Sequence, residues 1–261
     1  MSATRVLILR TAGTNCDLET EHAFSLAGAA VDRVHVRRMF EDPDAMRAYD
    51  ILALPGGFSY GDDIAAGRLW ANEFVHRLRP AMEEFVSCGK PVIGICNGFQ
   101  ALVRAGLLPG DDGLGAQTAT LAWNDSGLYE CRWTRLRVEP GPCVFTGGTG
   151  DVIELPVAHA EGKFAAPDDL YDGLEAAGRV ALRYVTADGG EAAYPANPNG
   201  SRGGVAGVCN ASGTVLGLMP HPERFVTRTQ HPRWTRPGAP SVGHGLAIFE
   251  NAVRYAAERT R

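Results

Sequence analysis

The chain has 261 residues, a formal net charge of −5 and 45% hydrophobic residues, which suits a globular protein with a sizeable core. Its acidic balance argues against nucleic-acid binding by bulk electrostatics, and no apolar run approaches the roughly 18 residues of a membrane span. Six scattered cysteines without a Cys-x-x-Cys pair indicate thiols in a reducing compartment rather than a disulfide framework or a zinc site. Because the N-terminus lacks a signal-peptide pattern, a cytoplasmic location is expected.

The first half of the chain alternates predicted strands with predicted helices. Strands are expected at 5–10, 31–36, 50–54 and 91–95, and helices at 17–29, 72–88 with a break at Pro80, and 98–107. The first helix is expected to place Leu18, His22 and Leu26 on one face. This alternation with short connections predicts an α/β fold, in which helices flank a central, mostly parallel sheet.

The second half has a different pattern. Residues 115–160 contain short strand-like stretches between Gly/Pro turns, which predict added antiparallel strands. Two further strands are expected at 205–209 and 215–219, and an amphipathic helix at 245–259. Since no repeat or clear linker divides the chain, residues 1–261 are expected to form a single domain.

The segment Gly94-Ile95-Cys96-Asn97-Gly98 places a cysteine between two glycines, where a predicted strand turns into a helix. So tight a reversal crowds the backbone, and small residues are needed two positions before and after its centre. Partial positive charge at the start of the helix favours a thiolate there. The pattern predicts a nucleophile at Cys96, although most cysteines are buried structural residues.

A thiol nucleophile needs a base, and the base needs an orienting group. His221 directly follows an apolar strand, as Cys96 does, and Pro222 favours an extended backbone at His221. Residues two apart in an extended segment project to the same side, so Glu223 can accept the ring N–H of His221. Cys96, His221 and Glu223 therefore form a candidate catalytic triad. Taken alone, His-Pro-Glu would more often be a surface turn.

Two further features support a reaction at this edge of the sheet. The Gly56 and Gly57 pair ends a predicted strand, and its N–H groups, with that of Asn97, can hold a developing oxyanion. Gln100 lies one helical turn after Cys96 and can contact an amide or amino-acid substrate. Alternatively, Gly56 and Gly57 form a plain glycine turn, and Gln100 is a solvated helix residue.

Several motifs together resemble a known family. GGFSYGD, CNGFQ, GTNCD, ANPNGS and MPHPER are similar to motifs of the class I glutamine amidotransferases, and most closely of the glutaminase subunits of phosphoribosylformylglycinamidine synthase. They run in order from residue 13 to residue 224. Departures are modest: Ala160 replaces a glycine in His-Ala-Glu-Gly, the motif GDDIAAG lacks the commoner aromatic residue after Gly-Asp, and the stretch 227–243 is longer than in compact members.

The resemblance implies a flavodoxin-like fold and a specific reaction. Cys96 would attack the side-chain amide of L-glutamine, while His221, oriented by Glu223, protonates the departing ammonia. The N–H groups of Gly56, Gly57 and Asn97 would stabilise the tetrahedral intermediates, and Gln100 would help to hold the substrate. Ammonia would pass to an ATP-dependent synthetase that makes formylglycinamidine ribonucleotide in purine biosynthesis.

The resemblance also implies partners. A synthetase subunit and a small third protein would complete the complex, and exposed loops around SYGDD, HAEG and YPANPNGSRGG are candidate contact surfaces. ATP and Mg²⁺ are expected on the synthetase, since this chain lacks a Gly-x4-Gly-Lys-Ser/Thr loop and a carboxylate cluster typical of Mg²⁺ binding. No cofactor and no metal are expected in this chain.

Other functions remain open from the sequence. A peptidase or glutamyl-peptide hydrolase of related fold would share the cysteine turn, but it gives no reason for GGFSYGD or ANPNGS. A non-catalytic docking subunit would be expected to have lost Cys96, His221 or Glu223, and all three are present. A zinc deaminase is excluded because no Pro-Cys-x-x-Cys follows His221. Cys16 has no assigned chemistry and is expected to be structural.

Overall fold

The computed structural model describes residues 3–110 and 114–259 of the chain. Within these residues one sheet contains nine strands in the order β2-β1-β3-β4-β11-β10-β9-β6-β7, and β5 pairs with β8 separately. The strands of the large sheet are β1 (Arg5–Arg10), β2 (Ala30–His35), β3 (Ile51–Leu54), β4 (Val92–Ile95), β6 (Glu130–Val138), β7 (Val152–His159), β9 (Val180–Val185), β10 (Val205–Cys209) and β11 (Val215–Leu218). The small pair is β5 (Thr120–Ala122) and β8 (Lys163–Ala165). The parallel strands with flanking helices and the added antiparallel strands were both predicted, and together they make a mixed sheet.

The two halves of the large sheet differ in direction and in burial. The strands β2, β1, β3, β4 and β11 are parallel, whereas β10, β9, β6 and β7 follow as antiparallel neighbours. Every residue of β3, β4 and β11 is buried, as expected for strands covered on both faces. In β7, buried residues alternate with more exposed ones, which is typical of an antiparallel sheet with one solvated face.

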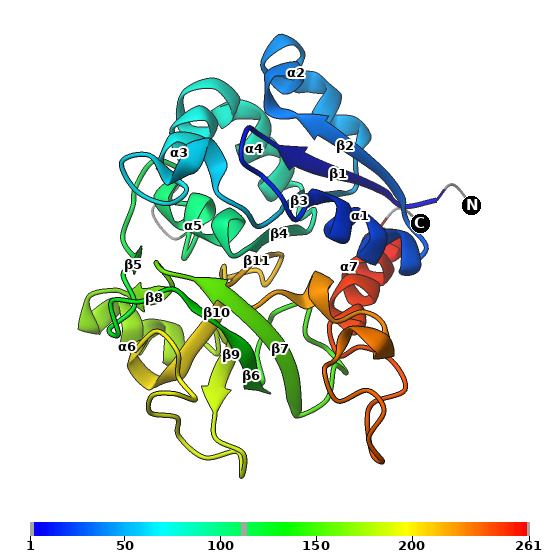
Figure 1. The fold of residues 1–261 in the computed structure, drawn as a ribbon. Coiled ribbons are helices and arrows are strands. Elements are labelled where there is room, and N and C mark those ends of the chain that lie inside the picture. Colours follow the sequence, from blue (N-terminus) through cyan, green and yellow to red (C-terminus); the bar gives the residue numbers. More distant parts are fainter. Residues whose placement is uncertain (1–2, 111–113, 260–261) are drawn as a thin grey trace.

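Helices cover the parallel half (Figure 1). They are α1 (Asp17–Leu26), α2 (Val36–Glu41), α3 (Arg68–Glu73), α4 (Arg79–Ser87), α5 (Asn97–Arg104) and α7 (Leu246–Arg259), while α6 (Asp168–Ala176) lies with the antiparallel strands. The first and last helices pack together through Phe24 and Phe249, whose ring centroids are 4.9 Å apart. Of the described residues, none belongs to a helix with the length and apolarity needed to cross a membrane.

The details of the helices differ in part from those predicted. Leu18, His22 and Leu26 lie on one face of α1, as predicted, and that face is exposed. The opposite face, with Thr20 and Phe24, is buried, because α1 packs against α7 through Phe24. The predicted helix 72–88 consists of α3, a π-helical turn at Phe74–Leu78 and α4, which confirms a break next to Pro80. The elements α2, β8, α6 and β9 were not predicted.

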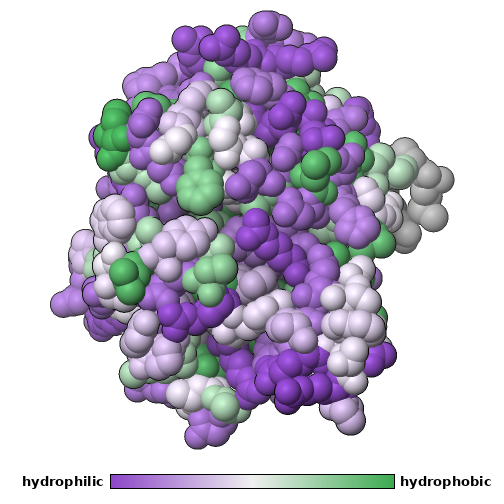
Figure 2. Space-filling view, in the orientation of Figure 1, coloured by the Kyte–Doolittle hydropathy of each residue, from purple (hydrophilic) through white to green (hydrophobic). Residues whose placement is uncertain are grey.

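Hydrophobic and hydrophilic residues are interspersed on the face of the molecule drawn in Figure 2, and the hydrophobic residues form separate groups. The larger exposed hydrophobic side chains of the molecule include Phe58, Ile64, Trp123, Tyr129 and Tyr194. The parallel strands β3, β4 and β11 are direct neighbours, so their carboxyl ends meet at one edge of the sheet. In open α/β sheets ligands bind outside these carboxyl ends.

Candidate active site

The turn between β4 and α5 has the geometry that its two glycines predict. Cys96 has φ 50° and ψ −104°, a strained conformation for a residue with a side chain. A Cβ atom on Gly94 would lie 2.8 Å from the backbone of Gly98, and one on Gly98 would overlap the carbonyl oxygen of Leu54. The helix therefore packs directly on β3 and β4, and only glycine fits at these two positions.

This turn places the Cys96 thiol at the carboxyl edge of the sheet, next to the first turn of α5. The residue is 5% exposed, and its Sγ atom lies 3.6 Å from the carbonyl oxygen of Ala158 on β7. The first N–H groups of a helix have no partner within the helix and carry partial positive charge. The position therefore puts the Cys96 sulfur beside the partial positive charge at the start of α5.

His221 and Glu223 lie at the end of β11, on and beside the short 3-10 helix Pro222–Arg224. His221 is extended, with φ −102° and ψ 93°, as predicted from Pro222. Its Nδ1 atom lies 2.6 Å from Oε1 of Glu223, and both side chains are buried. The carboxylate accepts the Nδ1 proton, which leaves the other ring nitrogen for chemistry. That atom, Nε2, is buried and has no hydrogen-bond partner among the described residues.

The charges around His221 favour its protonated form. Burial lowers the pKa of the imidazole, but the negative charges of Glu223 and of the Cys96 thiolate raise it, and the net result is a pKa well above the ordinary value. Cys96 after β4 and the His221–Glu223 pair after β11 therefore lie at the ends of neighbouring strands, close enough for the charge of Cys96 to act on the imidazole.

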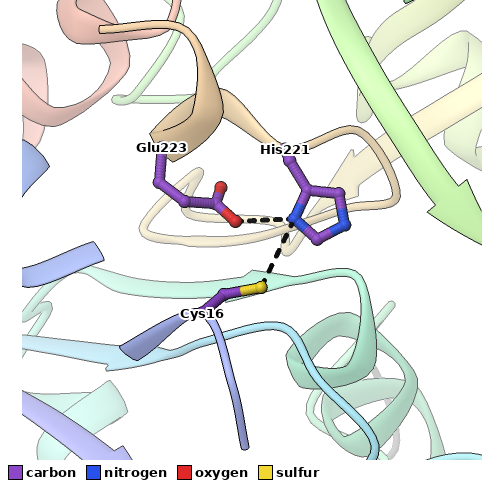
Figure 3. Close-up of side chains that lie close together, drawn as sticks. All are labelled: Cys16, His221 and Glu223. Carbon is purple, nitrogen blue, oxygen red and sulfur yellow. Dashed lines mark hydrogen bonds and ion pairs between the residues drawn. The ribbon is translucent and has the colours of Figure 1, made fainter. Parts of the chain in front are cut away.

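A second cysteine lies against the same imidazole (Figure 3). The Sγ atom of Cys16, which directly precedes α1, is 4.0 Å from Nδ1 of His221. Arg224 donates a hydrogen bond from Nη2 to this sulfur at 3.1 Å. Burial raises the pKa of the Cys16 thiol. The sequence alone indicated only a structural role for Cys16, and the single available signal was its place in the motif GTNCD.

The side chains of Cys16, His221 and Glu223 could also be considered as metal ligands, since their donor atoms lie within 4.8 Å of one another. Their hydrogen bonds do not suit a cation. Nδ1 of His221 carries the proton that it donates to Glu223, so it has no lone pair for a metal ion. The Cys16 sulfur already accepts a hydrogen bond from the guanidinium of Arg224. A cation would have to displace both, so this chemistry fits a hydrogen-bonded triad better than a metal centre.

The proposed oxyanion site consists of Gly56, Gly57 and Asn97, which lie at the same carboxyl edge of the sheet as Cys96. Gly57 has φ 145°, and a Cβ atom there would lie 2.8 Å from the backbone of Thr14. A Cβ atom on Gly56 would lie 2.8 Å from Cε1 of His221, so the glycine brings the backbone against the imidazole. The N–H groups of Gly56 and Gly57 make no hydrogen bond to the described residues, which leaves them free for a ligand.

A cavity of about 230 Å³ opens beside the Cys96 thiol. Its lining includes Gly57, Phe58, Asp62, Ala66, Cys96, Gln100, Trp123, Tyr129, Ala158, His159, Ala160 and Glu161. Gln100 is held at both ends of its amide, because Nε2 donates to the Glu161 carbonyl at 2.6 Å and Oε1 accepts from Asn97 at 2.9 Å. Gln100 lines the cavity, and its hydrogen bond to the Glu161 carbonyl holds the loop 159–162 in place.

Asp62, His159 and Glu161 are polar residues of the cavity that were not predicted from the sequence. They lie within the motifs SYGDD and HAEG, but an acidic residue in a glycine-rich loop gives no signal of burial by itself. Burial and the nearby charge of Glu161 raise the pKa of Asp62 to about 6. Burial lowers the pKa of His159 to about 3, so its imidazole is neutral.

An α/β sheet with a cysteine turn at one strand end, and a His–Glu pair at the next, is the arrangement of a glutamine amidotransferase. Known proteins of similar sequence agree with this class. The CobB/CobQ-like glutamine amidotransferase domain matches residues 3–256. The subunit PurQ of phosphoribosylformylglycinamidine synthase from Dehalococcoides mccartyi is 48% identical over 260 residues, covering 98% of this chain and 99% of that protein. The PurQ protein of Archaeoglobus fulgidus is 42% identical and covers 96% of each.

Solved structures give the same result. A chain in the structure of PurLQS from Thermotoga maritima has a TM-score of 0.74 and 32% identity, covering 97% of this chain and 99% of that one. A glutamine amidotransferase from the same organism has 18% identity and a TM-score of 0.52, which supports the fold alone. The chain belongs to the PurQ family of glutamine amidotransferases.

Proposed function

We propose that this chain is the glutaminase subunit of a phosphoribosylformylglycinamidine synthase, with Cys96, His221 and Glu223 as its catalytic triad. The observation that carries the proposal is the 48% identity to a PurQ subunit over nearly the full length, together with the strained Cys96 turn facing the His221–Glu223 pair. The family match over residues 3–256 and the continuous sheet also support a single domain.

In the first half of the reaction, the Cys96 thiolate adds to the side-chain amide carbon of L-glutamine. The carbonyl oxygen becomes an oxyanion, which the free N–H groups of Gly56, Gly57 and Asn97 stabilise. The His221 imidazolium then gives its Nε2 proton to the amide nitrogen, the C–N bond breaks and ammonia leaves. A glutamyl thioester remains on Cys96, and Gln100 keeps the cavity loop in place around the substrate.

In the second half, neutral His221 removes a proton from water, and the hydroxide adds to the thioester carbon. The second tetrahedral intermediate uses the same N–H groups. Its collapse breaks the C–S bond and releases glutamate, while the thiolate and the imidazolium form again. Glu223 keeps the Nδ1 proton of His221 in place throughout, so that only Nε2 exchanges protons.

Ammonia released beside Cys96 would be used by an ATP-dependent synthetase subunit that converts formylglycinamide ribonucleotide into the amidine. ATP and Mg²⁺ are assigned to that subunit, and a small third subunit completes the proposed complex in the cytoplasm. The exposed rings of Phe58, Trp123 and Tyr129 at the mouth of the cavity support a partner contact there, because exposed apolar groups often mark interaction surfaces.

The test is amidine formation by the complex of this chain with the synthetase from the same genome. Wild-type complex should use either L-glutamine or ammonium salts as the nitrogen source. A complex carrying Cys96→Ser should lose the glutamine-dependent reaction and keep the ammonia-dependent one. If the Cys96→Ser complex still uses glutamine, the proposed nucleophile is wrong; if glutamine supports no amidine formation with wild type, the proposed function is wrong.

A further inference from the structure

The segment 227–243 folds over the antiparallel end of the large sheet, where it is drawn in orange in Figure 1. Its two ends are joined, because the N–H of Gly245 donates to the carbonyl oxygen of Phe225 at 2.8 Å. Within the segment, the His231 ring packs on the ring of Trp133 from β6, with the ring centroids 4.5 Å apart. The segment is therefore a closed loop with a fixed place on the solvated face of β6 and β7.

A pocket of about 390 Å³ lies between this loop and the two strands. Its lining comprises Arg135, Glu154, His231, Arg233, Arg236, Pro237, Gly238, Ala239, Pro240 and His244. With both histidines counted as neutral, three arginines and one glutamate give the lining a net charge of +2, whereas the whole chain has −5. A concave surface with one dominant sign of charge attracts ligands of the opposite sign.

The single carboxylate of the pocket is already paired. Arg135 and Glu154 are direct cross-strand partners on β6 and β7, and Nε of Arg135 lies 3.0 Å from Oε1 of Glu154. The guanidinium of Arg233 lies 3.5 Å from the same oxygen. Arg236 has no ion pair or side-chain hydrogen bond among the described residues and is exposed. Glu154 can balance only one of the three guanidinium groups, so two positive charges remain for a ligand.

His244 adds a neutral donor to the same pocket. Its Nδ1 atom accepts the N–H of Glu154 at 2.9 Å, so the proton of the neutral ring is on Nε2. Burial lowers the pKa of His244, which keeps the ring neutral near pH 7. Neither Nε2 of His244 nor the backbone N–H of Gly238 has a hydrogen-bond partner in the part of the chain that the structure describes. Donors thus line the pocket from the strands and from the loop.

We propose that this pocket binds a phosphate group, either as the free ion or on a small phosphomonoester. A phosphate carries a charge of about −1.5 to −2 near pH 7, which matches the excess of +2, and its oxygens accept hydrogen bonds only. Guanidinium groups bind phosphate through paired N–H donors, and arginine is the only cationic residue type in the lining. The pocket has room for more than the ion alone, so a phosphomonoester of a small molecule also fits.

The pocket is separate from the proposed active site. It shares no lining residue with the cavity beside Cys96. Ala158, whose carbonyl oxygen lies 3.6 Å from the Cys96 sulfur, is four residues after Glu154 on β7, or about 13 Å along the strand. Phosphate binding is therefore a further property of the chain, and it can be tested without glutamine or ammonia.

The experiment is calorimetric titration of the full chain with inorganic phosphate, ribose 5-phosphate and succinate. Ionic strength is kept constant, because screening alters the affinity of an exposed site for an anion. Arg233→Gln, Arg236→Gln and the double variant each remove positive charge from the pocket. Arg38→Gln is the matched control, since Arg38 is an exposed arginine of α2, next to the opposite edge strand β2. Circular dichroism checks that all variants are folded.

Wild type should bind inorganic phosphate with a dissociation constant of about 0.1–5 mM, a range suited to so small an ion. Arg233→Gln and Arg236→Gln should each weaken binding about 5- to 20-fold, and the control should not change it. Succinate, a dianion with carboxylates in place of phosphate, should bind at least about 5-fold more weakly than phosphate.

The sugar phosphate identifies the occupant. Tighter binding of ribose 5-phosphate than of inorganic phosphate assigns the pocket to a phosphomonoester, and equal affinity assigns it to the free ion; both results support the proposal. Three results would overturn it: no binding of either phosphate compound to wild type, wild-type affinity in the folded double variant, or succinate binding as tightly as phosphate. None of them bears on the proposed glutaminase reaction.

Discussion

The Sγ atom of Cys16 and the Nδ1 atom of His221 lie 4.0 Å apart, so a second thiol packs against the proposed catalytic imidazole. The Cys16 sulfur also accepts a hydrogen bond from Arg224, and the backbone N–H of Cys16 donates to the carbonyl oxygen of Gly56 at 3.2 Å. It therefore connects the start of α1 to the two loops that form the proposed oxyanion site and base. Its position indicates a role in orienting His221.

Replacement of Cys16 by alanine should lower kcat about 3- to 10-fold with little change in KM, because one hydrogen-bonding contact of the imidazole is lost. That contact helps to raise the pKa of His221, so the alkaline limb of the pH–rate profile should move to lower pH. Cys209→Ala, in the buried β10 strand, is the control for lost volume and should leave the profile unchanged. If the pH–rate profile of Cys16→Ala is identical to that of wild type, Cys16 contributes only packing beside His221.

Glu223→Gln should lower kcat by about 10² to 10⁴-fold, since an amide can hold His221 in the wrong tautomer and no longer balances the imidazolium charge. The Cys96 thiol should also react more slowly with iodoacetamide near neutral pH, because the pKa of His221 falls when the Glu223 charge is removed. Glu19→Gln is a suitable control, as Glu19 lies 3.8 Å from Arg224 at the surface. Equal kcat values for Glu223→Gln and wild type would show that Glu223 is not a member of the triad.

Gly98→Ala should destabilise the protein by more than about 2 kcal/mol, because the new methyl group overlaps the carbonyl oxygen of Leu54, a backbone atom that cannot move aside. Gly173→Ala is the matched control. Gly173 lies in α6 with open space around it, so alanine should stabilise the helix by about 0.5–1 kcal/mol. Urea unfolding of both variants measures the difference. Equal free energies of unfolding would mean that the turn is looser than described.

Asp62→Asn should make the protein more stable at pH 7.5, by about 1 kcal/mol after allowance for solvent screening. The folded pKa of Asp62, about 6, lies above that of an unfolded aspartate, so ionised Asp62 destabilises the fold. The cost is absent below about pH 4 and complete above about pH 6, and the variant should match wild type in acid. Thermal unfolding at both pH values checks this. A loss of stability at pH 7.5 would show that Asp62 is a structural residue.

The sequence predicted those parts of the site that depend on local backbone geometry. Gly94 and Gly98 mark a turn that few other residues fit, and Pro222 makes the direction of His221 predictable, so Cys96, His221 and Glu223 could be selected without coordinates. The order of the strands that brings them together, β3-β4-β11, could not be read from the sequence.

Residues that act through tertiary contacts were missed. Cys16 meets His221 across 205 positions of the chain, and Oδ1 of Asn124 lies 3.1 Å from Nδ1 of His159, a residue of the cavity 35 positions away. No local pattern encodes such a pair. The sequence also did not show which face of α1 is buried, because that face is set by the packing of Phe24 against Phe249 of α7.

The most direct test of the account is to look for the glutamyl thioester on Cys96. The assembled complex is mixed with L-glutamine labelled in its carbon chain, stopped in acid within the first turnover and digested for peptide mapping. If Cys96 is the nucleophile, label is expected on the peptide that contains Cys96, it should be lost under mild base, and no labelled peptide should form with Cys96→Ser. Release of labelled glutamate at the wild-type rate by Cys96→Ser would contradict it.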